Sequence, residues 1–341
     1  MKDHHLEDIA QALVKEGKGI LAADESFGTI AKRFKKIGVE STEENRRRYR
    51  EMLFTTAGME AYISGVILFD ETIHQKTRDG VPFPQLLQNK GVIPGIKVDQ
   101  GKVDIPFFPG EQVTIGLDGL GDRLVGYFDL GARFTKWRAV IAIGKNIPTI
   151  YAIRANAQAL ARMAALSQHA GLVPIVEPEV LMDGDHSIEI CEAVTTKVLT
   201  TLYQELNQAR INLEGSLLKP NMVLPGKDCA EQVSDEQIAE ATIRTLKRAV
   251  PAAVPGVVFL SGGMSAEAAS ARLSAMNRRG PHPWQLGFSY GRALQDPSLN
   301  AWKGEDANVP LAQSLFHHRA HMNGLARHGE YREELEAETI N

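Results

Sequence analysis

The sequence predicts an α/β protein built as a closed (β/α)8 TIM barrel, and two observations carry this prediction. Short apolar, β-branched runs bounded by turn residues recur along the chain, and stretches with helical periodicity lie between them. The runs number eight, and no linker, low-complexity segment or change of composition divides the series. Such a series fits a barrel better than two separate domains, which the length of 341 residues would also allow.

The candidate strands are almost continuously apolar, as expected for strands covered on both faces in a parallel sheet. In chain order they are Gly19–Asp24, Gly65–Asp70, Gly95–Asp99, Phe134–Val140, Val173–Glu179, Ser216–Met222, Val257–Gly262 and Leu286–Gly291.

The segments between these runs are predicted to be helices. Capping-box spacing at Ser41–Glu44 and Ser234–Gln237 marks two helix starts. An apolar stripe runs along a further long segment, at Ile150, Ile153, Ala157, Leu160 and Ala164. We therefore expect one barrel domain over residues 1–341, with an added N-terminal helix at 1–16 and a C-terminal helical extension at about 303–341.

Charge and composition limit the cellular compartments and the binding partners that are expected for this protein. The net charge of −4 and pI near 6.2 give no general electrostatic reason to bind nucleic acid or an anionic membrane. The two cysteines, Cys191 and Cys229, cannot form a disulfide framework or a cysteine zinc site, which favours a reducing compartment. No stretch has the apolar length of a signal sequence or membrane span. We expect a soluble cytoplasmic protein without a metal site.

Nearly every candidate strand ends in groups capable of chemistry. In such a barrel the C-terminal strand ends and the loops after them form the active site. One buried ion pair there would be ordinary, but several lysines and carboxylates converging at one end indicate a functional site, because each buried charge costs free energy unless it is compensated. The groups are Asp24, Lys97 with Asp99, Lys136 with Arg138, Glu177 with Glu179, Lys219, Ser261, and Ser289 with Arg292.

Lysines inside a barrel mouth suggest covalent chemistry. A desolvated lysine beside another cation has a lowered pKa and can attack a carbonyl to form an iminium ion, which accepts electrons when a neighbouring carbon–carbon bond breaks. Lys219, within the apolar run LLKPNM, suits this role, and Lys136 is a plausible cationic neighbour. From these residues alone, ordinary salt bridges explain both lysines equally well.

Longer motifs resemble the class I fructose-bisphosphate aldolases, over the region from about Gly17 to Trp302. The motifs are GKGILAADES at Gly17–Ser26, GVILFDET at Gly65–Thr72, KWR at Lys136–Arg138, IVEPE at Ile175–Glu179, EGSLLKPNM at Glu214–Met222, FLSGG at Phe259–Gly263 and FSYGRAL at Phe288–Leu294.

The resemblance implies a role for each catalytic residue. Lys219 matches the family's Schiff-base lysine, and Glu177 matches its principal proton-transfer residue. Asp24 matches the acid that handles the proton of the C4 hydroxyl. Lys136 and Glu179 match the residues that tune this centre and assist carbinolamine chemistry.

The resemblance also implies two phosphate sites. The site for the ketone-end phosphate follows the last two candidate strands, where glycines let backbone N–H groups approach an anion. Its members are Ser261, Gly262, Gly263, Ser289, Gly291 and Arg292, and Arg33 is a further arginine of the substrate site. The groups nearer the other phosphate are Ser26, Thr29, Lys97 and Arg138.

The implied reaction is reversible cleavage of fructose 1,6-bisphosphate into dihydroxyacetone phosphate and glyceraldehyde 3-phosphate, without metal or cofactor, in glycolysis and gluconeogenesis. Related enzymes are often homotetramers. Two departures stand out: Phe27 replaces a small hydroxyl residue common in the family's ADES segment, and the chain ends in EYREELEAETIN without the terminal tyrosine of many animal members.

Two rival functions remain to be weighed. Another Schiff-base barrel enzyme, such as a transaldolase or a sugar-acid aldolase, would act on a substrate with one phosphate, and two apparent phosphate sites disfavour it. A binding or scaffolding protein that keeps only the fold would be supported by loss of Lys219 or Glu177, but both are present.

Overall fold

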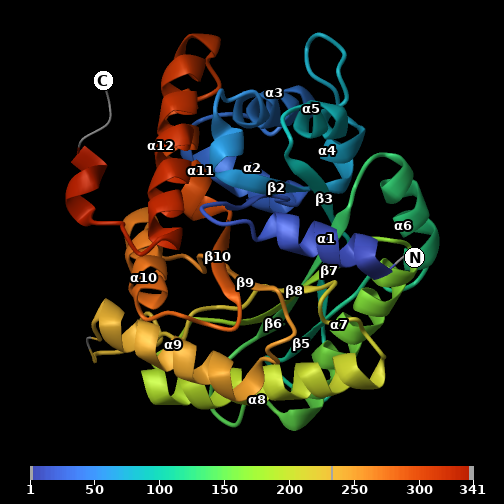
Figure 1. The fold of residues 1–341 in the computed structure, drawn as a ribbon, viewed down its shortest axis with the longest axis vertical. Helices are drawn as coiled ribbons and strands as arrows, with labels where there is room; N and C mark the ends of the chain where they lie inside the picture. Colours follow the sequence, from blue (N-terminus) through green and yellow to red (C-terminus); the bar gives the residue numbers. More distant parts are fainter. Residues whose placement is uncertain (1–2, 232, 338–341) are drawn as a thin grey trace.

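The computed structural model describes residues 3–231 and 233–337, and its centre is a closed barrel of parallel strands (Figure 1). Around the barrel the strands follow in the order β1, β10, β9, β8, β7, β6, β3, β2. Their bounds are β1 Gly19–Ala23, β2 Ile63–Leu68, β3 Ile93–Lys97, β6 Phe134–Ile141, β7 Val173–Val180, β8 Leu217–Leu218, β9 Gly256–Phe259 and β10 Gln285–Tyr290. The barrel predicted from the sequence is confirmed.

All eight candidate runs contain a barrel strand, but the run Ser216–Met222 is strand only at Leu217 and Leu218. Proline has no N–H to donate, so Pro220 ends the regular ladder. The backbone N–H of Lys219 still donates to the carbonyl of Val176 at 2.9 Å. This bond keeps Lys219 in line with the neighbouring strand.

Helices connect the strands and surround the barrel (Figure 1). Their bounds are α1 Asp3–Leu13, α2 Phe27–Lys36, α3 Glu43–Phe54, α4 Asp70–His74, α5 Phe83–Asn89, α6 Leu120–Asp129, α7 Ile150–His169, α8 Ile188–Gln208, α9 Asp235–Ala249, α10 Ala266–Arg278, α11 Arg292–Trp302 and α12 Val309–Arg327.

The helix starts test the capping predictions. Ser234 and Gln237 form a complete capping box at the start of α9, as predicted. The capping box at Ser41–Glu44 is wrong by one residue: Thr42 caps α3 by accepting a hydrogen bond from the N–H of Asn45 at 3.1 Å. Thr42 also has a hydroxyl, so spacing alone did not separate the two choices.

Helix α1 closes the N-terminal end of the barrel. Its apolar side, with Leu6, Ala10 and Leu13, packs on residues near the starts of the strands, among them Phe134 and Val173. In Figure 1 this helix lies across the strands in the middle of the view. Substrate can therefore enter the barrel only from the opposite end, where the strands finish.

The C-terminal segments pack on the same body. Arg327, at the end of α12, donates to the backbone carbonyl of Val14 at 2.8 Å. The turn η3 Glu333–Ala337 is tied back by Glu336, which pairs with Arg319 and accepts from the hydroxyl of Tyr331 at 2.9 Å. The predicted tail beyond residue 337 lies outside the described residues.

A hairpin that the sequence analysis did not predict sits between β3 and β6. Its strands, β4 Lys102–Asp104 and β5 Gln112–Thr114, pair antiparallel. The Thr114 hydroxyl donates to the carbonyl of Arg138 at 2.7 Å, and the Asn156 amide donates to the carbonyl of Gln112 at 2.9 Å. These bonds hold the hairpin at the rim of the open end.

The barrel wall gives the first testable prediction. A methyl group at Gly95 would lie 2.3 Å from the ring of the fully buried Phe134, whereas one at Gly121 in α6 would meet nothing within 4 Å. Gly95→Ala should lower the free energy of unfolding by about 2 kcal/mol through overpacking. Gly121→Ala, the control, should be neutral or stabilising by up to about 1 kcal/mol. Urea denaturation measures both, and equal midpoints would contradict the packing described.

Candidate active site

The predicted site residues meet at the C-terminal end of the barrel. All of them except Gly263 line one cavity of about 510 Å³. The lining members among them are Asp24, Ser26, Thr29, Arg33, Lys97, Lys136, Arg138, Glu177, Glu179, Lys219, Ser261, Gly262, Ser289, Gly291 and Arg292. Residues far apart in sequence are therefore brought into a single space by the closure of the barrel.

Strand register explains why the charged pairs of β6 and β7 point inward together. Arg138 lies beside Glu177 and Val140 lies beside Glu179 in the ladder. Side chains alternate between the two faces of a strand, so residues two apart share the inner face. Trp137, between two inward residues, is fully buried in the outer core instead.

Three charged groups and Lys219 form the centre of the site. The Lys219 Nζ lies 3.2 Å from one carboxylate oxygen of Glu177, and the Lys136 Nζ lies 2.8 Å from the other. Lys136 also donates to Asp24 at 2.8 Å. All four side chains are at most 7% exposed. Two carboxylates and two amines thus share one water-poor space.

The pKa values of the two lysines shift in opposite directions in this buried site. Burial lowers the pKa of Lys219, the nearby charge of Lys136 lowers it further, and Glu177 only partly opposes them, so the pKa lies below its ordinary value. Burial alone would also lower the pKa of Lys136, but Asp24 and Glu177 outweigh it and raise that pKa. Lys219 is therefore the amine more easily deprotonated, and Lys136 the permanent cation.

The carboxylates stay ionised. Burial would raise the pKa of Asp24, but Lys136 and Lys219 outweigh it and bring the pKa to about 2. The same two lysines hold the pKa of Glu177 below its ordinary value against the effect of burial. Both groups can therefore accept a proton once a lysine charge is consumed by reaction.

The cradle after β9 and β10 suits an anion. Gly262 and Gly263 have φ values of 56° and 101°, which side chains rarely adopt. A methyl group at Gly263 would lie 3.3 Å from the Arg292 guanidinium, so this glycine backs the arginine rather than lining the cavity. The buried Ser289 hydroxyl has no hydrogen-bond partner within the described residues. A phosphate oxygen would satisfy it.

Arg33 stands beside this cradle and is already paired. Its guanidinium bonds to Glu25 and, at 2.7 Å, to Asp296. Arg50 holds the other oxygen of Glu25 at 2.6 Å. Because Glu25 is fixed from two sides, Arg33 is held in place before substrate arrives.

The groups expected near the second phosphate are also paired. Lys97 lies 2.6 Å from an Asp99 oxygen, and Arg138 is paired with Glu179. The hydroxyls of Ser26 and Thr29 lie 3.2 Å apart at the start of α2. The two cations at this end therefore each have a carboxylate beside them already.

Comparison with known proteins identifies relatives over nearly the whole chain. The family model for glycolytic class-I fructose-bisphosphate aldolases matches residues 5–341. Cytosolic fructose-bisphosphate aldolase 4 of Arabidopsis thaliana is 56% identical over 93% of this chain and 81% of its own length. Fructose-bisphosphate aldolase 1 of Toxoplasma gondii is 54% identical over 96% of this chain and 90% of its own.

The chain belongs to the class I fructose-bisphosphate aldolase family. A solved aldolase from Plasmodium falciparum, in a complex with TRAP and a small molecule inhibitor, superposes with a TM-score of 0.96 at 52% identity. The match covers 97% of this chain and 96% of the other. The resemblance inferred from the motifs is confirmed, and the chain is not assigned to the transaldolases.

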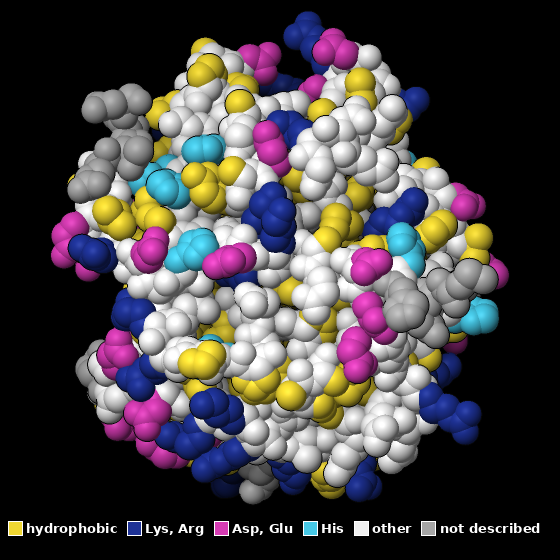
Figure 2. Space-filling model, viewed as in Figure 1, with side chains coloured by type: hydrophobic (Ala, Val, Ile, Leu, Met, Phe, Trp, Pro, Cys, Tyr) yellow, Lys and Arg dark blue, Asp and Glu magenta, His cyan; other side chains and the backbone are white. Residues whose placement is uncertain are grey.

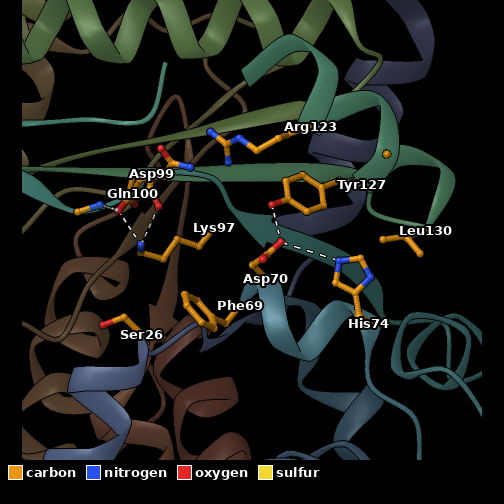
Figure 3. Close-up of a pocket in the computed structure, with 12 residues that line it drawn as sticks. Ser26, Phe69, Asp70, His74, Lys97, Asp99, Gln100, Arg123, Tyr127 and Leu130 are labelled. Carbon is orange, nitrogen blue, oxygen red and sulfur yellow. Dashed lines mark hydrogen bonds and ion pairs between the residues drawn. The ribbon is translucent and has the colours of Figure 1, made fainter. Parts of the chain in front are cut away.

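A second cavity of about 640 Å³ adjoins the site of this aldolase (Figure 3). It shares Ser26, Lys97 and Asp99 with the first cavity, and Figure 3 shows the Lys97 amine directed at Asp99. Its other end is lined by the ring of Tyr127, whose hydroxyl donates to Asp70 at 2.7 Å. The buried lysines and carboxylates of the candidate centre line the first cavity and not the second.

Phe27, the departure noted in the ADES segment, stands at the rim. It is 52% exposed and packs edge-on against Phe69, with ring centroids 5.1 Å apart. The Arg46 guanidinium lies over the ring, 4.9 Å from its centroid. The ring does not line the cavity that holds the candidate phosphate groups, and it offers no hydroxyl.

Sequence reasoning missed three charged residues that line the cavity of this aldolase: Glu25, Lys36 and Lys102. Glu25 lies between the predicted residues Asp24 and Ser26, so its position was available as a signal. Lys102 lies in the unpredicted hairpin, and Lys36 at the end of α2 looks like any solvated helix lysine. Only the fold brings these two lysines to the mouth.

The low pKa of Asp24 gives a pH prediction. Its folded value of about 2 lies below the ordinary 3.8, so the ionised group adds stability above about pH 4, and this stability is lost as pH falls through 2. Asp24→Asn should therefore be less stable than the unsubstituted enzyme by an amount that shrinks by roughly 2 kcal/mol between pH 5 and pH 2. Denaturant unfolding at each pH measures this gap, and a gap that does not vary with pH would refute the assignment.

Proposed function

We propose that Lys219 forms the Schiff base through which this aldolase cleaves fructose 1,6-bisphosphate. One observation carries the proposal: a buried amine of lowered pKa lies 3.2 Å from the carboxylate of Glu177, and a second lysine holds that carboxylate from its other side. This arrangement supplies a nucleophile, a proton carrier and a fixed positive charge in one place.

The steps follow from these positions. The ionised Glu177 carboxylate first takes a proton from the Lys219 ammonium, 3.2 Å away, and the neutral amine then attacks the ketone carbon. Glu177 returns this proton to the carbinolamine oxygen, which leaves as water, so an iminium forms and Glu177 is ionised again. Asp24 then takes the proton of the C4 hydroxyl. The electrons of the C3–C4 bond flow to the iminium nitrogen, giving an enamine and releasing glyceraldehyde 3-phosphate. Protonation at C3 and addition of water then return dihydroxyacetone phosphate and free Lys219.

Lys136 and Glu179 serve this sequence indirectly. Lys136 is bound to both Asp24 and Glu177, so its charge keeps both carboxylates ionised until they are needed. Glu179 is paired with Arg138 and fixes the direction of that guanidinium. We assign the ketone-end phosphate to Ser261, Gly262, Ser289, Gly291 and Arg292, with Gly263 and Arg33 in support. We assign the other phosphate to the side of Ser26, Thr29, Lys97 and Arg138.

The reaction so described needs no metal ion, because the iminium accepts the electrons that a metal-bound enolate would otherwise carry. Within the described residues, no group of three or more His, Cys, Asp or Glu side chains is arranged to hold a metal. His317 and His321, one turn apart on α12, pack their rings on Tyr62.

An oligomer is supported by the surface around the hairpin. Phe107 is 99% exposed, and the rings of Phe108 and Tyr151 stack 4.7 Å apart with Tyr151 55% exposed. Such exposed rings favour contact with another copy of the chain, and a homotetramer is the form we propose.

The packing of α1 and α12 on the barrel supports a single domain.

The expected location and partners rest on coarser observations. No helix among the described residues is long and apolar enough to cross a membrane. Figure 2 shows acidic and basic side chains interspersed over one face of the molecule, which supports the expectation that nucleic acid is not a partner. We propose a cytoplasmic enzyme, and the Arabidopsis relative, which is named a cytosolic aldolase, supports this.

Trapping tests the covalent step. Borohydride added during turnover should reduce the iminium and leave a three-carbon or six-carbon adduct on the peptide containing LLKPNM, detected by mass spectrometry. Lys219→Met should abolish the adduct. Lys136→Met should slow turnover by at least about 100-fold, because proton transfer is disturbed, yet leave any adduct on Lys219. An adduct on Lys136 or Lys97, or active cleavage without any adduct, would overturn the mechanism.

Chelation tests metal independence separately. Activity should survive exhaustive treatment with EDTA within experimental error, since the electron sink is the iminium. The control is a metal-dependent aldolase treated in parallel. Loss of activity that zinc restores would contradict the proposal, even if the fold and the family stand.

A further inference from the structure

The cavity carries more positive than negative groups, and the surplus can be located. Its carboxylates are Asp24, Glu25, Asp99, Glu177 and Glu179, and each lies in an ion pair with a lysine or arginine of the same cavity. After these pairs are counted, Lys36, Lys102 and Arg292 have no carboxylate within ion-pair distance among the described residues. These three charges are available to an incoming dianion.

Two of the three lie on the side of the ketone-end phosphate. Arg292 begins α11 directly after β10. Lys36 ends α2, one turn beyond Arg33, and Arg33 is bonded to Asp296 of α11. Helix α2 follows β1, which is the neighbour of β10 in the barrel.

Lys102 lies on the other side of the mouth. Strands β10 and β6 are four places apart in a ring of eight, so they face each other across the barrel. The hairpin that carries Lys102 sits between β3 and β6, and Lys102 is the register partner of Thr114, which is bonded to the carbonyl of Arg138. Because the hairpin is tied down there, Lys102 faces the phosphate that lies farthest from Arg292.

The charge of Lys102 is needed at that position. Lys97 and Arg138 line the same end, but Asp99 and Glu179 already offset their charges. A phosphate placed between these pairs would meet two carboxylates as well as two cations. An unpaired lysine supplies the net attraction that the pairs lack.

We propose that Lys102 binds the phosphate remote from the ketone and so determines the preference of this enzyme for a bisphosphate over a ketose that carries only the ketone-end phosphate. The inference rests on the proposed function and adds a specificity residue to it. The lysine acts on binding and not on bond cleavage, because it lies on the rim hairpin, away from the buried centre at Lys219.

The test compares two substrates on one variant. Lys102→Met should raise KM for fructose 1,6-bisphosphate by about tenfold with kcat little changed, and should leave cleavage of fructose 1-phosphate as it was. Lys102→Arg should keep most of the preference because the charge stays. Lys35→Met is the matched control, since it removes an exposed lysine of α2 that does not line the cavity.

The outcomes separate the two proposals. If the unsubstituted enzyme prefers the bisphosphate and Lys102→Met keeps the same ratio of kcat/KM values, the role of Lys102 is refuted while the proposed function stands. If Lys35→Met raises KM as much as Lys102→Met, the rise comes from the loss of any positive surface charge, and the specific role of Lys102 is again refuted. If the unsubstituted enzyme cleaves neither substrate and traps no adduct, the proposed function itself fails.

Discussion

The site depends on one shared carboxylate. Glu177 lies between the amines of Lys136 and Lys219, and neither lysine has an equivalent partner in the barrel interior other than Asp24. Burying two amines without compensation would be strongly unfavourable, so Glu177 is needed for the charges to be buried at all. The same carboxylate then stands within reach of the reacting amine. Glu177 thus both neutralises the buried lysine charges and, in the proposed mechanism, transfers the proton.

The barrel makes this arrangement possible because it is closed at one end and open at the other. Helix α1 fills the N-terminal end with apolar side chains, so water reaches the charged centre only through the mouth. Restricted hydration is what separates the two lysines, since desolvation lowers the pKa of Lys219 while the doubly paired Lys136 keeps its charge. Toward the rim, groups become more exposed, and unpaired cations such as Lys102 and Arg292 are tolerated there.

Much of the fold could be predicted because eight apolar runs and their spacing are local properties of the chain. The errors are local as well. The helix start at Ser41 was misplaced by one residue because Thr42 offers the same hydroxyl. Ile150, the first residue of the predicted apolar stripe, lies in the first turn of α7 and is 44% exposed. The β4–β5 hairpin was missed because its strands are three residues long, too short for an alternating pattern to be recognised.

By itself, the sequence determined which residue types stand at the ends of the strands, and through its motifs it determined the family. Both the strand-end residue types and the family motifs depend only on residues that are close together in the sequence. Which carboxylate neutralises which cation was decided only by the tertiary structure, because pairs such as Lys136 with Asp24 join strands that are 112 residues apart in the chain. Sequence spacing carries no information about such distances. The protonation of Lys219 and the unpaired charge of Lys102 both follow from that pairing, so only the closed barrel could reveal them.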